Sequence, residues 1–231
     1  MYLVLFDIDG TLLRTGGIGQ ASAKEALVHV FGTSGRIDQF YPGGRTIEGI
    51  FVDTLQDAGF DESVYLAERE RLYKVFFSIF QKNMEKDRDQ VYPLPGGRAL
   101  LKSLSARKEV MLGVVTGNHQ LTANLKLSAA GFDPKTFKVG AYGNESAVRA
   151  DLIPLVQERA EGITGQLFPG RSTVMIGDTT RDVMGAKEAG AQSVAVTTGT
   201  DDREMLASVQ PDYILPGLEN AQDVLEELIK S

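Results

Sequence analysis

The chain contains no cysteine. This absence excludes disulfide bonds, thiolate metal ligands and a cysteine nucleophile, and it is compatible with a cytoplasmic protein, which is the location we expect. No apolar run comes near the roughly 18 residues of a membrane span. The amino terminus also lacks the basic segment and the small-residue cleavage site of a secretory signal. We therefore expect no membrane partner.

A basic excess is missing too. Among 231 residues, 24 are Lys or Arg and 31 are Asp or Glu, which gives a net charge of -7 at pH 7. The acidic excess is shared between residues 15–89 and the rest of the chain, and neither part has the cation clusters typical of nucleic-acid binders. We expect no nucleic-acid partner. An anionic substrate would depend on a local cation and a few well-placed donors.

Several familiar catalytic motifs are also absent. The sequence has no GxxxxGK[ST], HExxH or GxSxG segment. Its two histidines, His29 and His119, fall on or beside predicted helices, where we expect structural or exposed roles. These absences exclude the phosphate-loop, zinc-protease and serine-hydrolase classes that the motifs define.

What the sequence does contain is an apolar run followed directly by two aspartates. Residues 2–6 have the composition of a strand buried on both faces of a parallel sheet. Asp7 and Asp9 follow this strand, and Gly10 allows the backbone to turn. Open α/β sheets bind ligands at this carboxyl edge, and buried carboxylates there need a partner. Mg²⁺ is the usual solution because it prefers oxygen ligands.

Further along the chain, strands alternate with helices. This alternation predicts βαβ units and a doubly wound parallel sheet, a Rossmann-like α/β fold to which the first strand also belongs. The predicted strands are 110–115, 137–139, 173–176, 193–196 and 213–215, and the predicted helices are 98–105, 121–130, 147–160, 181–189 and 218–229.

Residues 15–89 follow a different pattern. Apolar residues recur at helical spacing in three stretches without a strand, which predicts a small helical bundle. Glycines 16, 17 and 19 precede the bundle, whereas a polar run at 81–90 and the Pro/Gly segment 93–97 follow it. We therefore expect a helical domain at 15–89, inserted into a core made of residues 1–14 and 90–231.

Two other strand ends carry polar residues. The strand at 110–115 ends in Thr116-Gly117-Asn118, where a hydroxyl and backbone N–H groups at a helix start could hold a phosphoryl oxygen. The strand at 173–176 ends in Gly177-Asp178, with Asp182 one helical turn further on. Asp178 is either a metal ligand or simply the cap of the next helix.

Taken in order, these segments resemble the motifs of the haloacid dehalogenase-like superfamily. Asp7-Ile8-Asp9-Gly10-Thr11 is similar to its first motif, Thr116 to its second, and the GDxxxD pattern at 177–182 to its fourth. The third motif usually has a Lys, and here Arg149 takes that place unless it is only a solvated residue at a helix start. Arg keeps the positive charge but is not equivalent to Lys.

The spacing of the motifs is informative about the inserted domain. About 109 residues separate the first two motifs and about 33 the next two, so the insertion falls where the family's C1-type caps fall. Within it, Gly43-Gly44-Arg45-Thr46 resembles a turn that phosphoglycolate phosphatase-like members direct at the active site. Arg45 is therefore either a substrate contact or an Arg that merely begins a helix.

The resemblance implies a Mg²⁺-dependent phosphatase of small phosphorylated metabolites. Asp7 would be the nucleophile and Asp9 the acid and base, while Asp7, Asp178 and the main-chain carbonyl of Asp9 would bind the metal. Phosphate oxygens would be held by Thr116, Gly117, Asn118 and Arg149, and Asp182 would orient its neighbours. Two alternatives remain open, a phosphomutase of the β-phosphoglucomutase type and a non-catalytic binder of phosphometabolites.

Overall fold

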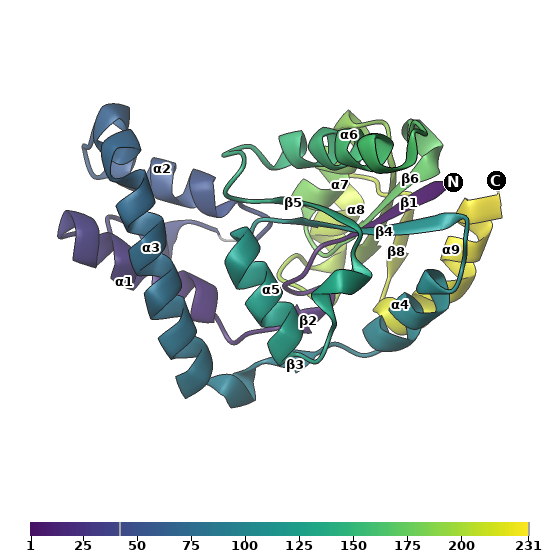
Figure 1. Cartoon of the computed structure of the whole chain (residues 1–231), viewed down its shortest axis with the longest axis horizontal. Helices are drawn as coiled ribbons and strands as arrows, with labels where there is room; N and C mark the ends of the chain where they lie inside the picture. The colour runs from purple at the N-terminus through teal and green to yellow at the C-terminus, as the bar shows by residue number, and fades with distance from the viewer. Residues whose placement is uncertain (42, 231) are drawn as a thin grey trace.

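The fold is built on a six-stranded parallel sheet. The computed structural model describes residues 1–41 and 43–230. In this part of the chain the strand order is β5-β4-β1-β6-β7-β8 (Figure 1). The order reverses beside β1, and such a switch point is where open α/β sheets bind ligands. The strands are β1 (Tyr2–Phe6), β4 (Val110–Thr116), β5 (Val139–Tyr142), β6 (Thr173–Gly177), β7 (Gln192–Val196) and β8 (Tyr213–Leu215).

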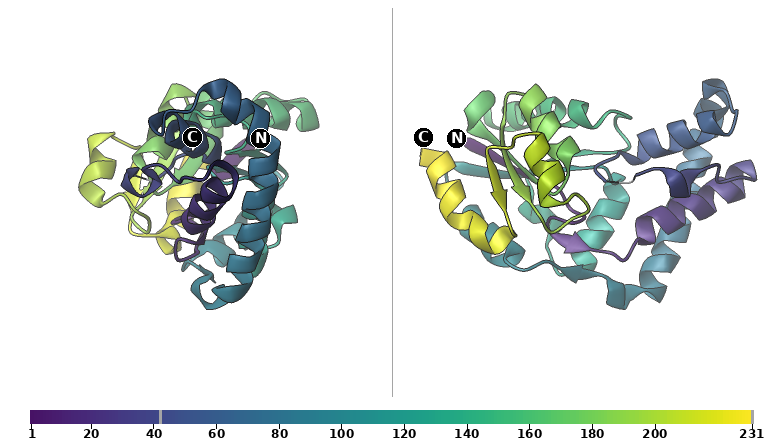
Figure 2. Two further views of the ribbon diagram at one scale, coloured as in Figure 1. Left: turned by 90° about the vertical axis from the view of Figure 1, so that its left-hand side faces the viewer. Right: turned by 180° about the vertical axis from the view of Figure 1, so that it is seen from behind.

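Helices cover both faces of the sheet because successive side chains of a buried strand point in opposite directions. Leu3 and Leu5 of β1 pack in a cluster with α6 and α7, whereas Val4 and Phe6 pack in a second cluster with α4, α5 and α9. The views in Figure 2 show these two helical layers. The doubly wound α/β fold predicted from the sequence is confirmed. The helices are α4 (Gly97–Ser105), α5 (Gln120–Ala129), α6 (Leu152–Thr164), α7 (Thr180–Glu188), α8 (Arg203–Ser208) and α9 (Ala221–Lys230).

A helical insertion extends from one end of the sheet. It consists of α1 (Ile18–Phe31), α2 (Ile47–Asp57) and α3 (Glu62–Lys86), which occupy the left side of Figure 1. Its interior is aromatic. The ring centroids of Phe51 and Phe76 lie 5.7 Å apart, and those of Phe76 and Phe80 lie 6.0 Å apart. The predicted helical insertion is therefore present, whereas its domain boundaries at 15 and 89 stay a prediction.

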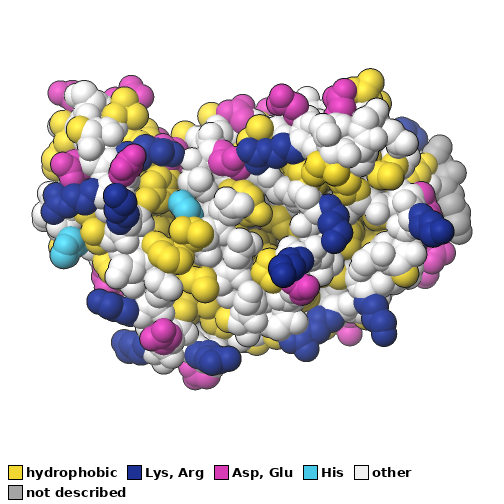
Figure 3. All heavy atoms as spheres, viewed as in Figure 1, with side chains coloured by type: hydrophobic (Ala, Val, Ile, Leu, Met, Phe, Trp, Pro, Cys, Tyr) yellow, Lys and Arg dark blue, Asp and Glu magenta, His cyan; other side chains and the backbone are white. Residues whose placement is uncertain are grey.

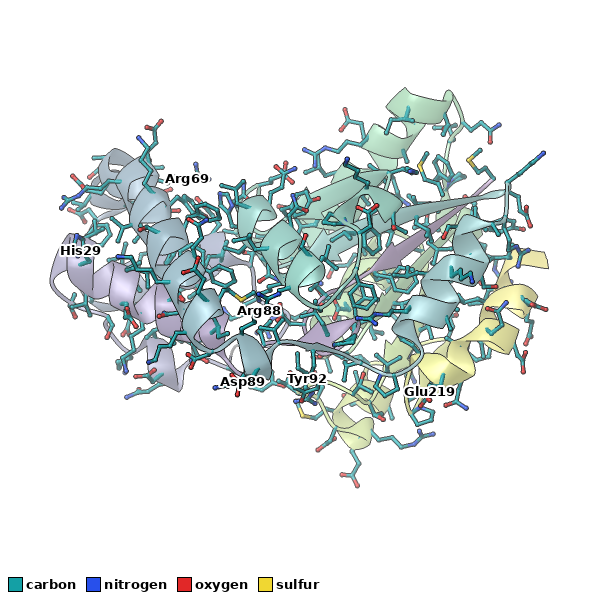
Figure 4. All side chains as sticks on the ribbon, turned by 60° about the horizontal axis from the view of Figure 1, so that its bottom comes forward. His29, Arg69, Arg88, Asp89, Tyr92 and Glu219 are labelled. Carbon is teal, nitrogen blue, oxygen red and sulfur yellow. The ribbon has the colours of Figure 1, made fainter. Side chains whose placement is uncertain are left out.

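Two short strands join the insertion to the core. β2 (Leu13–Arg14) pairs antiparallel with β3 (Tyr92–Pro93), so the outgoing and returning connections lie side by side. The sequence had not predicted this pairing, because two residues are too few for a periodic pattern. Figure 4 shows Asp89 and Tyr92 where the chain returns from α3 to the core.

The observed boundaries of two helices differ from those predicted. The polar run at 81–86 continues α3, because Met84 is buried and the side-chain amide of Asn83 donates a hydrogen bond to the Ser22 hydroxyl at 3.1 Å. Helix α6 begins at Leu152 and not at 147, because residues 149–151 form a 3-10 turn that buries Arg149. This shift brings the guanidinium to the centre of the molecule.

The surface carries charges of both signs. Over the face shown in Figure 3, Lys and Arg side chains are interspersed with Asp and Glu, and hydrophobic side chains gather over α3 and α5, where the insertion meets the core. No helix among the described residues is long and apolar enough to cross a membrane.

Candidate active site

The polar residues of the site lie at the ends of three neighbouring strands. β1 pairs in parallel with β4 on one side and with β6 on the other. The carboxyl ends of these strands therefore meet at one edge of the sheet, which places Asp7, Thr116 and Asp178 close together. All three are buried, with 6%, 0% and 2% of their surface exposed.

The acidic side chains form a tight cluster. Carboxylate oxygens of Asp7, Asp178 and Asp182 lie within 4.8 Å of one another. Burial raises the pKa of Asp7 to about 7, against the opposing charge of Arg149. Burial, together with the charge of Asp7, raises the pKa of Asp178 well above its usual value. The arrangement thus concentrates negative charge in a place where it is costly.

The cluster fits a hard divalent cation. Its donors are all carboxylate oxygens, which Mg²⁺ prefers, and a cation there would favour their charged forms. Two glycines leave the space around Asp178 open: a Cβ at Gly10 would lie 2.5 Å from the Asp178 carboxylate, and one at Gly199 would lie 1.6 Å from it. Thr11 donates to Asp178 Oδ1 at 2.9 Å and fixes its orientation.

Asp182 is largely occupied by hydrogen bonds. Thr179 caps α7, and its backbone N–H and hydroxyl both donate to Asp182 Oδ2, at 3.1 and 2.7 Å. The other oxygen accepts from Arg149 at 2.5 Å. Because Thr179 is the N-cap, Asp178 does not cap this helix. The geometry agrees with the orienting role predicted for Asp182, which stays a prediction.

Arg149 lies deep in the site and is not a solvated residue, since its side chain is 6% exposed. One guanidinium nitrogen, Nη2, donates to Asp7 Oδ1 at 2.9 Å, to Asp182 Oδ1 and to the Val115 carbonyl at 3.1 Å. Its buried Nε has no hydrogen-bond partner among the described residues. That N–H is therefore an unsatisfied buried donor.

The loop after β4 approaches the insertion very closely. Asn118 donates from Nδ2 to the Thr116 hydroxyl at 2.8 Å, which orients the hydroxyl beside the acidic cluster. The Gly117 carbonyl accepts from the backbone N–H of Ile47 at 2.8 Å. A Cβ at Gly117 would lie 2.0 Å from the Arg45 carbonyl. Glycine is therefore required here by the close approach of the two backbones.

Asp9 has a different environment from Asp7. Its carboxylate accepts hydrogen bonds from Thr15 at 3.1 Å, Asn118 at 2.7 Å and Lys126 at 2.7 Å. Burial would raise the pKa of Asp9, but the charge of Lys126 and these hydrogen bonds outweigh burial and lower it. Two carboxyls one residue apart thus have opposite pKa shifts.

Sequence reasoning missed Lys126. This lysine lies on α5, is 3% exposed, and also donates to Asn118 Oδ1 at 2.7 Å. Its position in the sequence could have indicated burial. Ala123 and Leu127 mark the buried face of α5, and Lys126 lies on that face. A buried lysine on an apolar helical stripe needs an acidic partner, here Asp9.

Arg45 lies over the site, but its charge is paired within the insertion. Its Nη2 forms an ion pair with Asp53 and donates to the Gly49 carbonyl at 3.3 Å, and its guanidinium lies 5.0 Å from the centroid of the Phe40 ring. The turn around it contacts the core through several bonds. Thr46 donates to the Ala147 carbonyl at 2.9 Å. The structure thus brings Arg45 to the site without showing it as a substrate contact.

All of these groups surround one cavity of about 710 Å³. Asp7, Asp9, Thr116, Arg149 and Asp178 line its inner end, and α1, α2 and α3 contribute to its outer end. Its size is within the range of about 300–1,000 Å³ found for small-molecule sites. The site is therefore a chamber between core and insertion.

Comparison with known proteins agrees with this geometry. A family profile described as haloacid dehalogenase-like hydrolase matches residues 4–196. A pyrophosphatase PpaX from Halalkalibacterium halodurans is 26% identical over 226 residues, which cover 96% of this chain and 95% of that protein. A phosphoglycolate phosphatase from Neisseria meningitidis is 27% identical over 236 residues, covering 96% and 93%.

Solved structures show the same fold. A haloacid dehalogenase-like hydrolase from Streptococcus pneumoniae superposes with a TM-score of 0.61 at 24% identity, and the match covers 98% of each chain. A predicted phosphoglycolate phosphatase from Haemophilus somnus superposes with a TM-score of 0.66 at 22% identity, covering 97% of this chain and 98% of that one.

Proposed function

The chain belongs to the haloacid dehalogenase-like hydrolases, and we propose that it is a Mg²⁺-dependent phosphatase that hydrolyses phosphomonoesters of small metabolites through an aspartyl-phosphate. One observation carries this proposal: Asp7 and Asp178 are buried together at adjacent strand ends, with Arg149 hydrogen-bonded to Asp7 and with Asp9 close by. The similarity to a phosphoglycolate phosphatase supports a phosphomonoester as substrate.

In the first step, Asp7 attacks the phosphorus of the ester in line. A bond forms between the Asp7 carboxylate and phosphorus, and the bond from phosphorus to the ester oxygen breaks. Asp9 donates a proton to that leaving oxygen. Asp9 needs to be protonated for this step, and the negative charge of a bound phosphate favours that form.

In the second step, water hydrolyses the aspartyl-phosphate. Asp9, now a carboxylate, accepts a proton from the water as the oxygen attacks phosphorus, and Asp7 leaves with its bonding electrons. The charge of Lys126 favours this charged form of Asp9. Phosphate is released and both aspartates return to their initial state.

The remaining groups stabilise charge on the phosphoryl oxygens. The side chains of Arg149 and Thr116 line the end of the cavity, where their donors would meet the equatorial oxygens. Asp7, Asp178 and the main-chain carbonyl of Asp9 would hold Mg²⁺. When bound, this ion would offset the charge of the carboxylates and of the phosphoryl group.

Phosphate release from a panel of phosphorylated metabolites tests the proposal. The panel contains phosphoglycolate, pyrophosphate and hexose phosphates, each assayed with and without Mg²⁺. Native protein is compared with Asp7→Asn, which preserves shape but removes the nucleophile. We expect release that requires both Mg²⁺ and Asp7. Pyrophosphate is included because one relative is named a pyrophosphatase.

Two results would contradict the proposal. Release that Asp7→Asn leaves intact would mean that another group is the nucleophile. Turnover of a hexose phosphate only in the presence of a sugar bisphosphate, without net phosphate release, would indicate a phosphomutase.

A further inference from the structure

The cavity changes character from its inner to its outer end. The inner end is polar and charged, as a phosphoryl site requires. The outer end includes apolar side chains from all three helices of the insertion and the loop between α1 and α2, beside the polar side chains of Gln20 and Gln90. These apolar side chains are Ala23, Ile37, Phe40, Ile47, Ile50 and Phe76.

Few charges face the outer end. Of the residues at positions 15–89 that line the cavity in the described part of the chain, two are charged, Arg45 and Asp89. Figure 4 places Asp89 at the base of α3, beside the return to the core. Its negative charge would repel a second anionic group on a substrate.

Two of the nearby cations, Arg45 and Lys126, are already paired with carboxylates. Arg45 forms an ion pair with Asp53 and its guanidinium lies over the Phe40 ring. Lys126 forms an ion pair with Asp9, whereas Arg14 on β2, which is exposed and also lines the cavity, donates to the Thr198 carbonyl at 2.5 Å and forms no ion pair among the described residues. A carboxylate or second phosphate on a leaving group that lay against the apolar side chains of the insertion, without reaching Arg14, would therefore be buried without a counter-charge, which is unfavourable.

The volume is also larger than a small acid needs. A cavity of about 710 Å³ corresponds to roughly 20 water molecules, at about 30 Å³ for each. The phosphoryl group of the substrate fills only the inner end. The apolar remainder would be filled by a larger leaving group, with gain from the hydrophobic effect.

We propose that the substrate is a phosphomonoester of an apolar alcohol, with an alkyl or aryl leaving group of about six or more carbons that lies against Ile50, Phe40 and Phe76 and carries no second anionic group. This inference rests on the phosphatase function proposed above and goes beyond it. The relatives named for phosphoglycolate and pyrophosphate act on smaller, more anionic compounds, so this chain would differ from them in specificity.

A homologous series of alkyl phosphates tests the inference. Values of kcat/KM are measured for ethyl, butyl, hexyl and octyl phosphate, together with phosphoglycolate. Each methylene that enters the chamber should raise kcat/KM about fourfold up to hexyl phosphate, the factor that corresponds to the transfer of one CH₂ from water. Hexyl phosphate should exceed phosphoglycolate by at least about tenfold.

A pair of matched variants assigns the effect to the chamber. Ile50 and Val52 are β-branched, half-buried residues of α2, but only Ile50 lines the cavity. In Ile50→Ser, each added methylene should raise kcat/KM by about twofold or less. In Val52→Ser, each methylene should raise kcat/KM as much as in the native protein. Thermal unfolding of both variants verifies that they are folded.

Binding of alkylphosphonates gives an independent readout. These compounds are not hydrolysed, so calorimetry measures binding without turnover. We expect the Kd to fall as the chain lengthens, with a negative heat-capacity change that marks burial of apolar surface.

The outcomes separate the two proposals. Asp7-dependent release with no chain-length dependence, or with phosphoglycolate as the fastest substrate, would overturn the apolar specificity and leave the phosphatase function standing. Absence of Asp7-dependent release from every compound, including hexyl phosphate, would overturn the phosphatase function and this inference with it.

Discussion

The charges of the site form two separate groups. Arg149 pairs with Asp7 and Asp182, whereas Lys126 pairs with Asp9. This separation gives the neighbouring carboxyls different properties. Burial raises the pKa of Asp7, whereas the charge of Lys126 and the hydrogen bonds to Asp9 outweigh burial and lower the pKa of Asp9. Distinct environments of this kind allow two carboxyls to take different chemical roles.

Arg149→Lys tests the altered third motif. Lysine keeps the charge but loses the planar guanidinium, which contacts three oxygens. We expect kcat/KM to fall by about tenfold, and Arg149→Met to cost at least about a hundredfold. The control is Arg159→Lys, since Arg159 pairs with Glu145 away from the site. Equal activity of native protein and Arg149→Lys would show that the guanidinium is not needed.

Lys126→Met tests the cation beside Asp9. The substitution leaves the partly buried Asp9 carboxylate without its counter-charge and removes one of the three side chains that hold it. We expect kcat to fall by about tenfold to a hundredfold, with a smaller change in KM. Lys102→Met on the exposed face of α4 is the matched control and should be neutral. Activity of Lys126→Met within about twofold of native would contradict an essential role of this ion pair.

The sequence could predict some of these residues and not others. The sequence predicted four site residues because each lies at the end of an apolar strand, and parallel strands bring their ends to one edge of the sheet. These residues are Asp7, Asp9, Thr116 and Asp178. The sequence did not predict Lys126, because its partner Asp9 lies 117 residues away in sequence and only the fold brings the two together.

At the scale of elements, α2 and α3 are joined by a partly buried polar network. Glu48 on α2 accepts hydrogen bonds from Arg69 at 2.8 and 2.9 Å and from the Tyr73 hydroxyl at 2.6 Å. Burial would raise the pKa of Glu48, but the bonds from Arg69 and Tyr73 outweigh it and lower the pKa. Arg69 also donates to the Asn144 carbonyl of the core at 2.8 Å. The network therefore connects the insertion to the core.

Glu48→Gln should make the protein less stable in a pH-dependent way. A carboxyl with a lowered folded pKa adds stability above its unfolded pKa of about 4.3 and loses it as pH falls through the folded value. We expect the variant to lose about 1–2 kcal/mol of unfolding free energy at neutral pH, and this difference to shrink below about pH 4. Urea unfolding over a pH series measures it.

The control for that experiment is Glu68→Gln. Glu68 forms an exposed ion pair with Arg71 on the surface of α3, and such pairs contribute little. A Glu48→Gln effect that is as small as the Glu68→Gln effect, or that does not vary with pH, would contradict the stabilising role of the network.

Elements with long periodic patterns could be predicted, and short or irregular ones could not. The sequence predicted β1, β4 and β6 because each is an apolar run. It also predicted the helices of the insertion, because their apolar residues recur at helical spacing. β2 and β3 have two residues each, and α6 begins later than predicted because Arg149 turns inward to reach Asp7. Tertiary contacts, which a local pattern does not contain, decide such boundaries.

At the scale of the whole molecule, the insertion is fastened to the core over the site. Backbone N–H groups of Ile47 and Glu48 donate to the carbonyls of Gly117 and Gly143, at 2.8 and 3.0 Å. Thr46 adds two bonds, since its hydroxyl accepts from the Gly49 N–H as the cap of α2 and donates to the Ala147 carbonyl. These bonds therefore hold the insertion over the site.

Thr46→Val removes both bonds while preserving shape. We expect a loss of about 1–2 kcal/mol in unfolding free energy, as for a lost helix cap, together with a lower kcat/KM because the turn that carries Arg45 is no longer held. Thr164→Val is the control, since Thr164 donates to a carbonyl within its own helix, α6. If both variants behaved alike in stability and in kcat/KM, the fastening role of Thr46 would be wrong.

The alternation of strands and helices was enough to predict the overall architecture, because a parallel sheet needs helical crossovers. The sequence did not predict how the insertion contacts the core. These contacts include backbone hydrogen bonds such as that from Ile47 to Gly117, which any residue with an N–H and a carbonyl can make.

The most direct test of the central claim is capture of the phosphorylated nucleophile. Native protein with Mg²⁺ and a turned-over phosphomonoester is quenched rapidly in acid, and the peptide Met1–Arg14, which trypsin would release by cleavage after Arg14, is analysed by mass spectrometry. We predict a phosphoryl group on Asp7, absent when Mg²⁺ is omitted and absent in Asp7→Asn. Phosphate released during turnover without any phosphorylated Asp7, or a phosphoryl group on another residue, would contradict the account.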